Sequence, residues 1–256
     1  MDERLVAFGR LLKIMDELRE KCPWDSKQTF ETLRHLTIEE TYELADAIVE
    51  KDLNEIKKEL GDILLHIVFY AKIASETNTF NIKDVIDSLC EKLIVRHPHI
   101  YGNVEAKTDE QVKINWEKIK LKQGNKSVLE GVPPSLPSIV KAYRIQEKAR
   151  GAGFDWEHTG QVWDKVIEEM NEMQQEIKLN SESQKIEDEF GDLLFALINY
   201  SRFINVNPDA ALEKTNKKFI RRFKYIESQA KNTGKALHDM SLAEMDVFWN
   251  EAKKLE

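Results

Sequence analysis

Residues 39–43 read Glu-Glu-Thr-Tyr-Glu, and residues 59–64 read Glu-Leu-Gly-Asp-Ile-Leu. The same pattern returns in the second half of the chain, where residues 168–172 read Glu-Glu-Met-Asn-Glu and residues 189–194 read Glu-Phe-Gly-Asp-Leu-Leu. A pattern that recurs with its internal spacing nearly preserved indicates duplication of one structural unit. The sequence therefore predicts a pair of carboxylate-bearing segments that occurs twice.

The sequence around each copy is repeated as well. The matched flanking segments are residues 23–25 with 154–156, residues 92–96 with 218–222, and Trp116 with Trp249. Duplication of a whole domain explains these matches better than coincidence within one short motif.

The composition favours an all-α fold. The chain has 256 residues with only 10 glycines and 6 prolines, and its apolar residues recur every three or four positions on both sides of the middle. That spacing is typical of helices with one buried face, and no stretch alternates with period two for long enough to predict a strand. We expect two tandem helical domains with packing of the four-helix-bundle type.

One interruption marks the expected domain boundary. Residues 124–137 contain Gly124 and three prolines, Pro133, Pro134 and Pro137, which cannot all lie inside a helix. We predict an N-terminal domain over residues 1–123, a linker over 124–137 and a C-terminal domain over 138–256.

Charge and cysteine content limit the class of protein. The net charge of −8 argues against a general nucleic-acid surface, so an anionic substrate would need local cations. Cys22 and Cys90 have no metal-ligand or redox spacing, which favours reduced thiols in a cytoplasmic protein. The N-terminus does not resemble a signal peptide, and no window resembles a membrane span, so we expect no membrane partner.

The acidic residues fall in register across each predicted hairpin. Residues three apart share a helix face, so Glu40 pairs with Glu43, and Glu59 pairs with Asp62. Folding back at residues 51–52 would place Glu43 opposite Glu59 and Glu40 opposite Asp62. In the second copy, folding back at residues 180–181 would place Glu172 opposite Glu189 and Glu169 opposite Asp192.

Four converging carboxylates repel one another unless cations or protons neutralise them. All-oxygen ligands favour Mg²⁺, with Mn²⁺ as a substitute, and Mg²⁺ commonly shares its shell with substrate phosphates. A single Glu-x-x-Glu is more often a solvated helix face, but two copies in matched register favour a metal site. A di-iron bundle would need Glu-x-x-His pairs, which neither copy has; we interpret His66, whose counterpart is Ala196, as a core or supporting residue.

Clustered cations could hold a triphosphate in the second half. Lys218, Arg221 and Arg222 lie within about a helical turn, and Trp249 could stack on a base, although such residues are also common as solvent-facing and core positions. Lys165 and Lys185 each precede a cluster glutamate by four residues, and the first copy has Leu36 and Glu55 there. Counted this way, the second site has two more cations and should bind a triphosphate better.

The duplicated pattern resembles the signature of the all-α nucleoside triphosphate pyrophosphohydrolase superfamily. The segments Cys-Pro-Trp-Asp at 22–25, Arg-His-Pro-His at 96–99, Leu-Glu-Gly-Val-Pro-Pro at 129–134 and Gly-Phe-Asp-Trp at 153–156 resemble the two-domain MazG family. This resemblance implies Mg²⁺-dependent hydrolysis of nucleoside triphosphates to the monophosphate and pyrophosphate, with broad base tolerance, in a homodimer. It also implies that the C-terminal domain carries the main activity.

The resemblance also assigns roles to residues. It implies metal binding by Glu169, Glu172, Glu189 and Asp192, and nucleotide contact by Lys165, Glu168, Lys185, Lys218, Arg221, Arg222 and Trp249. We expect Glu168 or Glu172 to orient the attacking water. The corresponding set for a first site is Glu39, Glu40, Glu43, Glu59, Asp62, Lys92, Arg96 and Trp116.

Two other functions stay open at this point. One is a housecleaning enzyme with a narrow preference for dUTP or a damaged nucleotide. The other is a regulatory protein that senses nucleotide without turnover.

Overall fold

The protein consists of helices joined by turns and loops in the part that its computed structural model describes, namely residues 2–108, 111–112, 115–116, 118–119 and 127–256. No strand occurs within these ranges. The predicted all-α class is confirmed. The chain divides into two compact units, residues 1–112 and 113–256. Residues 127–137 of the predicted linker fall in the second unit and 124–126 lie outside the described residues, so the predicted domain boundaries stay a prediction.

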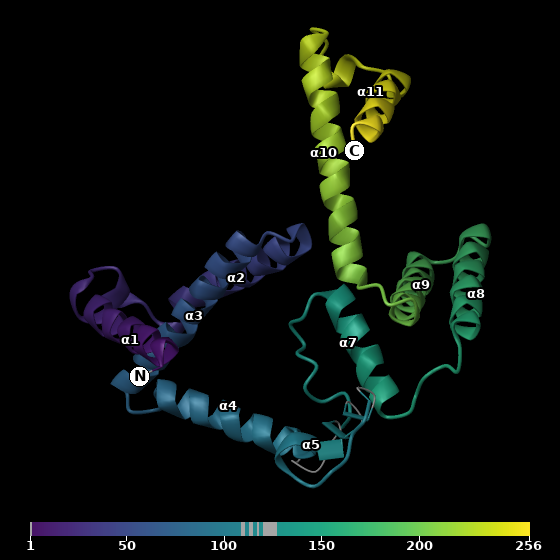
Figure 1. The fold of residues 1–256 in the computed structure, drawn as a ribbon. Helices are drawn as coiled ribbons and strands as arrows, with labels where there is room; N and C mark the ends of the chain where they lie inside the picture. The colour runs from purple at the N-terminus through teal and green to yellow at the C-terminus, as the bar shows by residue number, and fades with distance from the viewer. Residues whose placement is uncertain (1, 109–110, 113–114, 117, 120–126) are drawn as a thin grey trace. The chain divides into compact units, whose positions relative to one another are not determined.

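The first unit is built around the hairpin of α2 and α3 (Figure 1). Its elements are α1 (Glu3–Lys21), the 3-10 turn η1 (Asp25–Lys27), α2 (Phe30–Glu50), α3 (Leu53–Glu76), α4 (Ile82–Arg96) and α5 (Pro98–Tyr101). Lys51 ends α2 in the left-handed conformation, with φ of 59°, and the Asp52 side chain caps α3 by accepting from the backbone N–H groups of Asn54 and Glu55. This turn folds α3 back along α2, at the position that the sequence predicts.

The core of the first unit lies where α1, α2 and α3 meet. Met15, Leu33, Val68, Phe69 and Ile73 form its buried apolar cluster. Each of these side chains is removed from water, and burial of this kind is the main favourable contribution to folding. The core therefore lies beyond one end of the acidic segment and holds α2 and α3 in fixed register.

The second unit repeats the hairpin as α8 and α9 (Figure 1). Its elements are α7 (Ser138–Gly151), α8 (Thr159–Lys178), α9 (Ser183–Phe203), α10 (Pro208–Asn232), the 3-10 turn η2 (Leu237–Asp239) and α11 (Leu242–Lys254). Asn180 has a φ of 47° in the turn between α8 and α9, a conformation that asparagine tolerates better than most residues. The observed turn again matches the predicted one.

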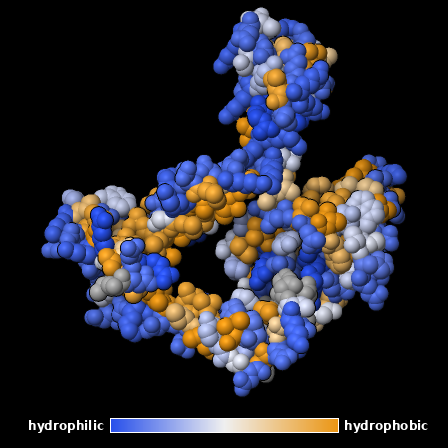
Figure 2. Space-filling model, in the orientation of Figure 1, coloured by the Kyte–Doolittle hydropathy of each residue, from blue (hydrophilic) through white to orange (hydrophobic). Residues whose placement is uncertain are grey.

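The remaining helices of the second unit pack around this hairpin and next to it. α7 packs against α9, and α10 packs against both α7 and α11. Many apolar side chains stay at the surface, among them Phe190, Leu194 and Leu197 of α9 at 52%, 45% and 40% exposure. Figure 2 shows such apolar patches between hydrophilic residues. The predicted completion of four-helix bundles stays a prediction.

Candidate functional site

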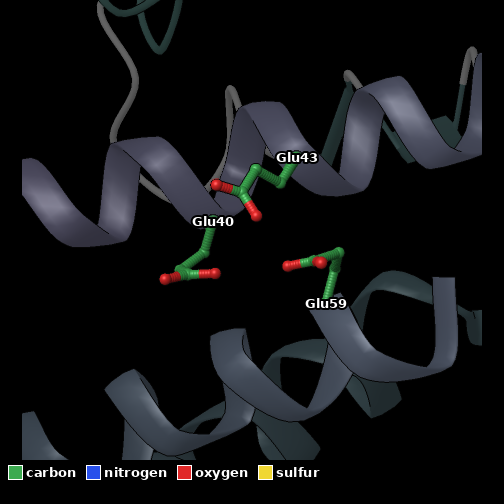
Figure 3. A group of neighbouring side chains, drawn as sticks. All are labelled: Glu40, Glu43 and Glu59. Carbon is green, nitrogen blue, oxygen red and sulfur yellow. The ribbon is translucent and has the colours of Figure 1, made fainter. Parts of the chain in front are cut away.

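The first hairpin brings together three carboxylates from two helices. Glu40 and Glu43 come from α2 and Glu59 from α3, and each offers an oxygen within 4.8 Å of the others. Figure 3 shows these three side chains pointing into the space between the helices. Asp62 is near enough for its charge to raise the pKa of Glu40, after burial as the larger cause. The structure thus gathers four of the predicted first-site acids.

A lysine that the sequence interpretation overlooked neutralises part of this first cluster. Glu59 is fully buried, and Lys58 donates from Nζ to Glu59 Oε1 at 2.8 Å and to Glu55 Oε1 at 2.7 Å. The hydrogen bond from Lys58 lowers the pKa of Glu59 in spite of burial. Among the described residues, Glu59 Oε2 has no hydrogen-bond partner. A buried carboxylate oxygen without a donor is costly, and a bound cation would relieve that cost.

The second hairpin forms the corresponding cluster from Glu169 and Glu172 on α8 and Glu189 on α9, again within 4.8 Å. Glu169 is 6% exposed. Burial raises the pKa of Glu189, and the negative charges of Glu172, Glu169 and Asp192 raise it further. Repulsion of this kind indicates that the four predicted ligands are close enough to act on one another.

Lys165 occupies the second cluster. Its Nζ lies 2.7 Å from Glu168 Oε1 and 2.7 Å from Glu169 Oε1. The hydrogen bonds that Lys165 donates to Glu168 and Glu169 raise the pKa of Lys165, so its ammonium is charged at neutral pH. The predicted position of Lys165 beside the acidic face is therefore observed, whereas Lys185 is an exposed residue in the first turn of α9.

The charge difference between the two clusters is smaller than the aligned positions suggest. Lys58 supplies the first cluster with a cation, and its counterpart in the second copy is Asp188, which accepts from Gln184 Nε2 at 3.0 Å. Each cluster thus has one paired lysine, but on a different carboxylate. Lys58 could have been found from its spacing of three residues after Glu55 and one before Glu59.

The predicted phosphate-binding cations gather elsewhere in the second unit. Arg221 and Arg222 of α10 both bond the Glu256 carboxylate, with Nη2 to oxygen distances of 2.5 Å. The Arg222 guanidinium carbon lies 5.3 Å from the ring centroid of Trp249, and the Phe219 ring lies 5.2 Å from it. Lys218 is half-buried on the same helix. This group assembles where α10 packs against α11, and none of its members lines the cavity at the second cluster.

The remaining predicted residues of the first site lie outside its carboxylate cluster. Glu39 is exposed on α2, while Lys92 and Arg96 lie on α4. Trp116 belongs to the second compact unit. The described cluster of the first unit is limited to Glu40, Glu43 and Glu59, with Asp62 and Lys58 beside it.

A cavity of about 610 Å³ opens from the second cluster. Lys165, Glu169 and Asp192 line one part of it, and α7, α9 and the segment 153–156 line the rest. Gln146 and Asn199 contribute amide groups there. The sequence interpretation missed both residues, because an isolated amide in a helix carries no spacing signal. The sequence marks the segment 153–156 as a repeated flank and as a motif of resemblance, but not as a wall of a cavity.

The donor set of each cluster suits a hard divalent cation. Carboxylate oxygens are the ligands that Mg²⁺ and Mn²⁺ prefer, and burial together with repulsion from neighbouring acids raises the pKa values of Glu40 and Glu189. No histidine or cysteine lies in either described group, which fits zinc and copper poorly. The residues present therefore fit a magnesium ion.

Both acidic hairpins match a known protein family. The family model for the MazG nucleotide pyrophosphohydrolase domain matches twice, over residues 28–101 and 160–226, so each match spans one acidic hairpin. The chain belongs to the MazG family. The duplicated unit that the sequence predicts is therefore a tandem MazG domain.

Whole-length relatives agree with the MazG assignment. A Thermotoga maritima protein named nucleoside triphosphate pyrophosphohydrolase/pyrophosphatase MazG is 43% identical over 99% of this chain and 98% of its own length. The Escherichia coli K12 nucleoside triphosphate pyrophosphohydrolase is 39% identical over 97% and 98%. The crystal structure of a mazG-related protein from Thermotoga maritima matches 44% of this chain and 98% of that one, with 29% identity and a TM-score of 0.40.

Proposed function

We propose that this MazG-family chain hydrolyses nucleoside triphosphates to nucleoside monophosphates and pyrophosphate at the cluster of its second hairpin. The observation that carries the proposal is the continuity of this cluster with a cavity large enough for a nucleotide, at a wall formed by Lys165, Glu169 and Asp192. Relatives named for this activity match the chain over nearly its whole length. Broad base tolerance and a role in cleaning the nucleotide pool are part of the proposal.

Glu169, Glu172, Glu189 and Asp192 would hold Mg²⁺, with Mn²⁺ as a substitute. A bound Mg²⁺ supplies neutralisation of phosphate charge and polarisation of the bond to be broken. Lys165 holds phosphate oxygens as a point charge. Glu168 or Glu172 accepts a proton from the water that attacks the α-phosphorus, and pyrophosphate leaves on the opposite side.

We also propose nucleotide contacts for the basic group of α10 and α11, which lies outside the cavity at the second cluster. Arg221 and Arg222 already share one carboxylate, that of Glu256, and two guanidinium groups so placed can hold a phosphate by the same charge-assisted bonds. Lys218, Lys185 and Trp249 are the further nucleotide contacts of this proposal. Trp249 would stack against a ring of the substrate or support Arg222 through its face.

A homodimer in the cytoplasm is the proposed form of the protein. Phe190, Leu194 and Leu197 lie on one side of α9 and stay exposed, and exposed apolar side chains grouped on one helix are typical of association surfaces. Within the described residues, no helix has the length and apolarity needed to cross a membrane. A second copy packed on α9 would complete the four-helix arrangement.

The test is a panel of ribo- and deoxyribonucleoside triphosphates assayed with Mg²⁺, with pyrophosphate and phosphate measured separately. Pyrophosphate from every base supports the proposal. Pyrophosphate from dUTP alone, or from one other nucleotide alone, would replace the proposed broad hydrolase with an enzyme of narrow specificity. Binding of nucleotide without product would replace it with a nucleotide sensor. Glu172→Gln should abolish release, with Glu43→Gln as the matched variant of the first hairpin.

A further inference from the structure

We propose that the part of the cavity lined by α7, α9 and the segment 153–156 binds the nucleobase, and that Gln146 accepts a hydrogen bond from an N–H group of that base. The inference rests on the proposed function and deepens it by naming the group that contacts the base. Gln146 and Asn199 lie in this part of the cavity, and Lys165, Glu169 and Asp192 lie at its acidic wall.

Gln146 has an amide group of which one atom is hydrogen-bonded and the other is not. It is 6% exposed, and its Nε2 donates to the backbone oxygen of Phe195 at 2.8 Å. That bond orients the amide, so Oε1 is the group left to interact with a ligand. Among the described residues, Oε1 has no hydrogen-bond partner. A buried acceptor without a donor is unfavourable, and a ligand that brings an N–H group would satisfy it.

Asn199 supplies the opposite polarity in the same cavity. Its Oδ1 accepts from Arg202 Nη2 at 2.9 Å, which leaves the Nδ2 amino group as the donor end. An acceptor and a donor together suit every nucleobase, because each base has an N–H group next to a ring nitrogen or carbonyl acceptor on its edge. This pair therefore explains how one pocket could accept several bases.

Charged residues that themselves line the cavity hold one of its walls in place. Arg202 pairs with Asp155 through Nη1 and Nη2, with Nη1 to Oδ2 at 2.8 Å, and Arg150 lies 3.6 Å from the same carboxylate. This pairing fixes the segment that carries Trp156, which also lines the cavity. Aromatic faces stack on bases with little regard to sequence.

A buried lysine holds a further part of the cavity wall in place. Lys148 is 3% exposed and donates from Nζ to the backbone oxygens of Val128 at 3.1 Å and Glu130 at 3.3 Å. Between these two residues, Leu129 lines the cavity. The pocket thus has largely apolar walls, two oriented amide groups and the ion pair of Asp155 with Arg202, a composition expected of a small-molecule site.

The proposed base pocket and the acidic wall belong to the same cavity, so one nucleotide could contact both. Glu169 and Asp192 belong to the predicted metal ligands, and both line the cavity that also contains Gln146. A nucleotide with its phosphates at the acidic wall would direct its base along the same cavity, towards the amides. Charged and apolar parts of the substrate would each meet a matching surface.

The experiment compares ATP with purine riboside triphosphate, which lacks the 6-amino group and has no N–H donor on its base. The wild-type protein should show a KM about tenfold higher for the analogue with little change in kcat, the size expected for one hydrogen bond to a buried acceptor. Equal KM values for the two substrates would overturn the proposal, and this comparison requires no variant.

Gln146→Met then tests the residue itself. It should raise the KM for ATP about tenfold and leave the KM for the analogue unchanged, and it should weaken binding of the α,β-methylene analogue of ATP, measured by calorimetry, by the same factor. Gln174→Met, at an exposed position of α8, is the matched control and should change none of these values. An equal effect of Gln146→Met on ATP and the analogue would assign Gln146 a structural role and overturn the proposal. Binding without turnover by the wild type would refute the proposed hydrolysis and leave the calorimetric comparison valid.

Discussion

Replacing Lys165 with methionine should lower kcat/KM for nucleoside triphosphates about tenfold, while Lys58→Met should change it less than twofold. The two lysines are a matched pair, because each donates to one cluster glutamate and one neighbouring glutamate at 2.7–2.8 Å. They differ in the hairpin that they serve. The comparison therefore asks which cluster performs the main reaction.

The expected size follows from the surroundings of Lys165. A net charge-assisted hydrogen bond is worth about 1.5–3 kcal/mol. The Lys165 side chain is 36% exposed, so solvent screening favours the lower end, about 1.5 kcal/mol, which corresponds to about tenfold in kcat/KM. Methionine keeps the apolar length of the side chain and removes its charge, so the loss reports the ammonium group.

The assay measures initial rates of pyrophosphate release over a range of nucleoside triphosphate concentrations at saturating Mg²⁺. Thermal unfolding of both variants serves as the control, because each loses an ion pair to a buried cluster glutamate and should show a similar shift. A loss below twofold for Lys165→Met, or an equal loss for Lys58→Met, would refute the assignment of the main reaction to the second hairpin.

Three further predictions concern the metal, the pocket wall and the assembly. Glu189→Gln should leave the unfolding temperature of the metal-free protein unchanged or raise it, because it removes a carboxylate whose pKa is raised by burial and by neighbouring acids. The variant should also abolish the rise in unfolding temperature on adding Mg²⁺. A fall of several degrees in the metal-free protein would contradict this prediction. Burial alone would raise the pKa of Asp155, but Arg202 and Arg150 hold it below the ordinary 3.8, so its stabilisation is complete above that pH and is lost as the pH falls further. The difference in unfolding temperature between wild type and Asp155→Asn should therefore be largest near neutral pH and shrink as the pH falls below 3.8. A constant difference would count against the ion pair. Light scattering at micromolar concentration should give the mass of two chains, and a fully active monomer would exclude the proposed dimer.

Local patterns were enough to predict the helices and their turns. The residues at 51–52 and at 180–181 break two apolar periodicities, and both turns lie where these breaks predict them. Each hairpin then brings its acids together because residues at equal distances from a tight turn meet across two antiparallel helices. The gathering of Glu169, Glu172 and Glu189 was for this reason readable from spacing alone.

Other contacts depend on residues that are distant in the chain. Gln146 of α7 meets the backbone of Phe195 in α9, and Arg202 meets Asp155 across a whole hairpin. No periodicity connects such positions, because their separation is set by how helices pack and not by the helical repeat. The nucleobase pocket that we propose could be recognised only in the folded chain.

Features that the sequence predicts differ from those that it does not predict for one physical reason. Spacing within a helix or across one turn is dictated by backbone geometry, so the all-α class, the duplication and both acidic clusters follow from the amino-acid order. Which side chain neutralises each cluster depends on the conformation of a long flexible lysine. Lys58 pairs with Glu59, whereas Lys165 pairs with Glu169. The position of Arg221, Arg222 and Trp249 at the junction of α10 and α11, and the orientation of the Gln146 amide, depend on packing between elements, which only the tertiary structure decides.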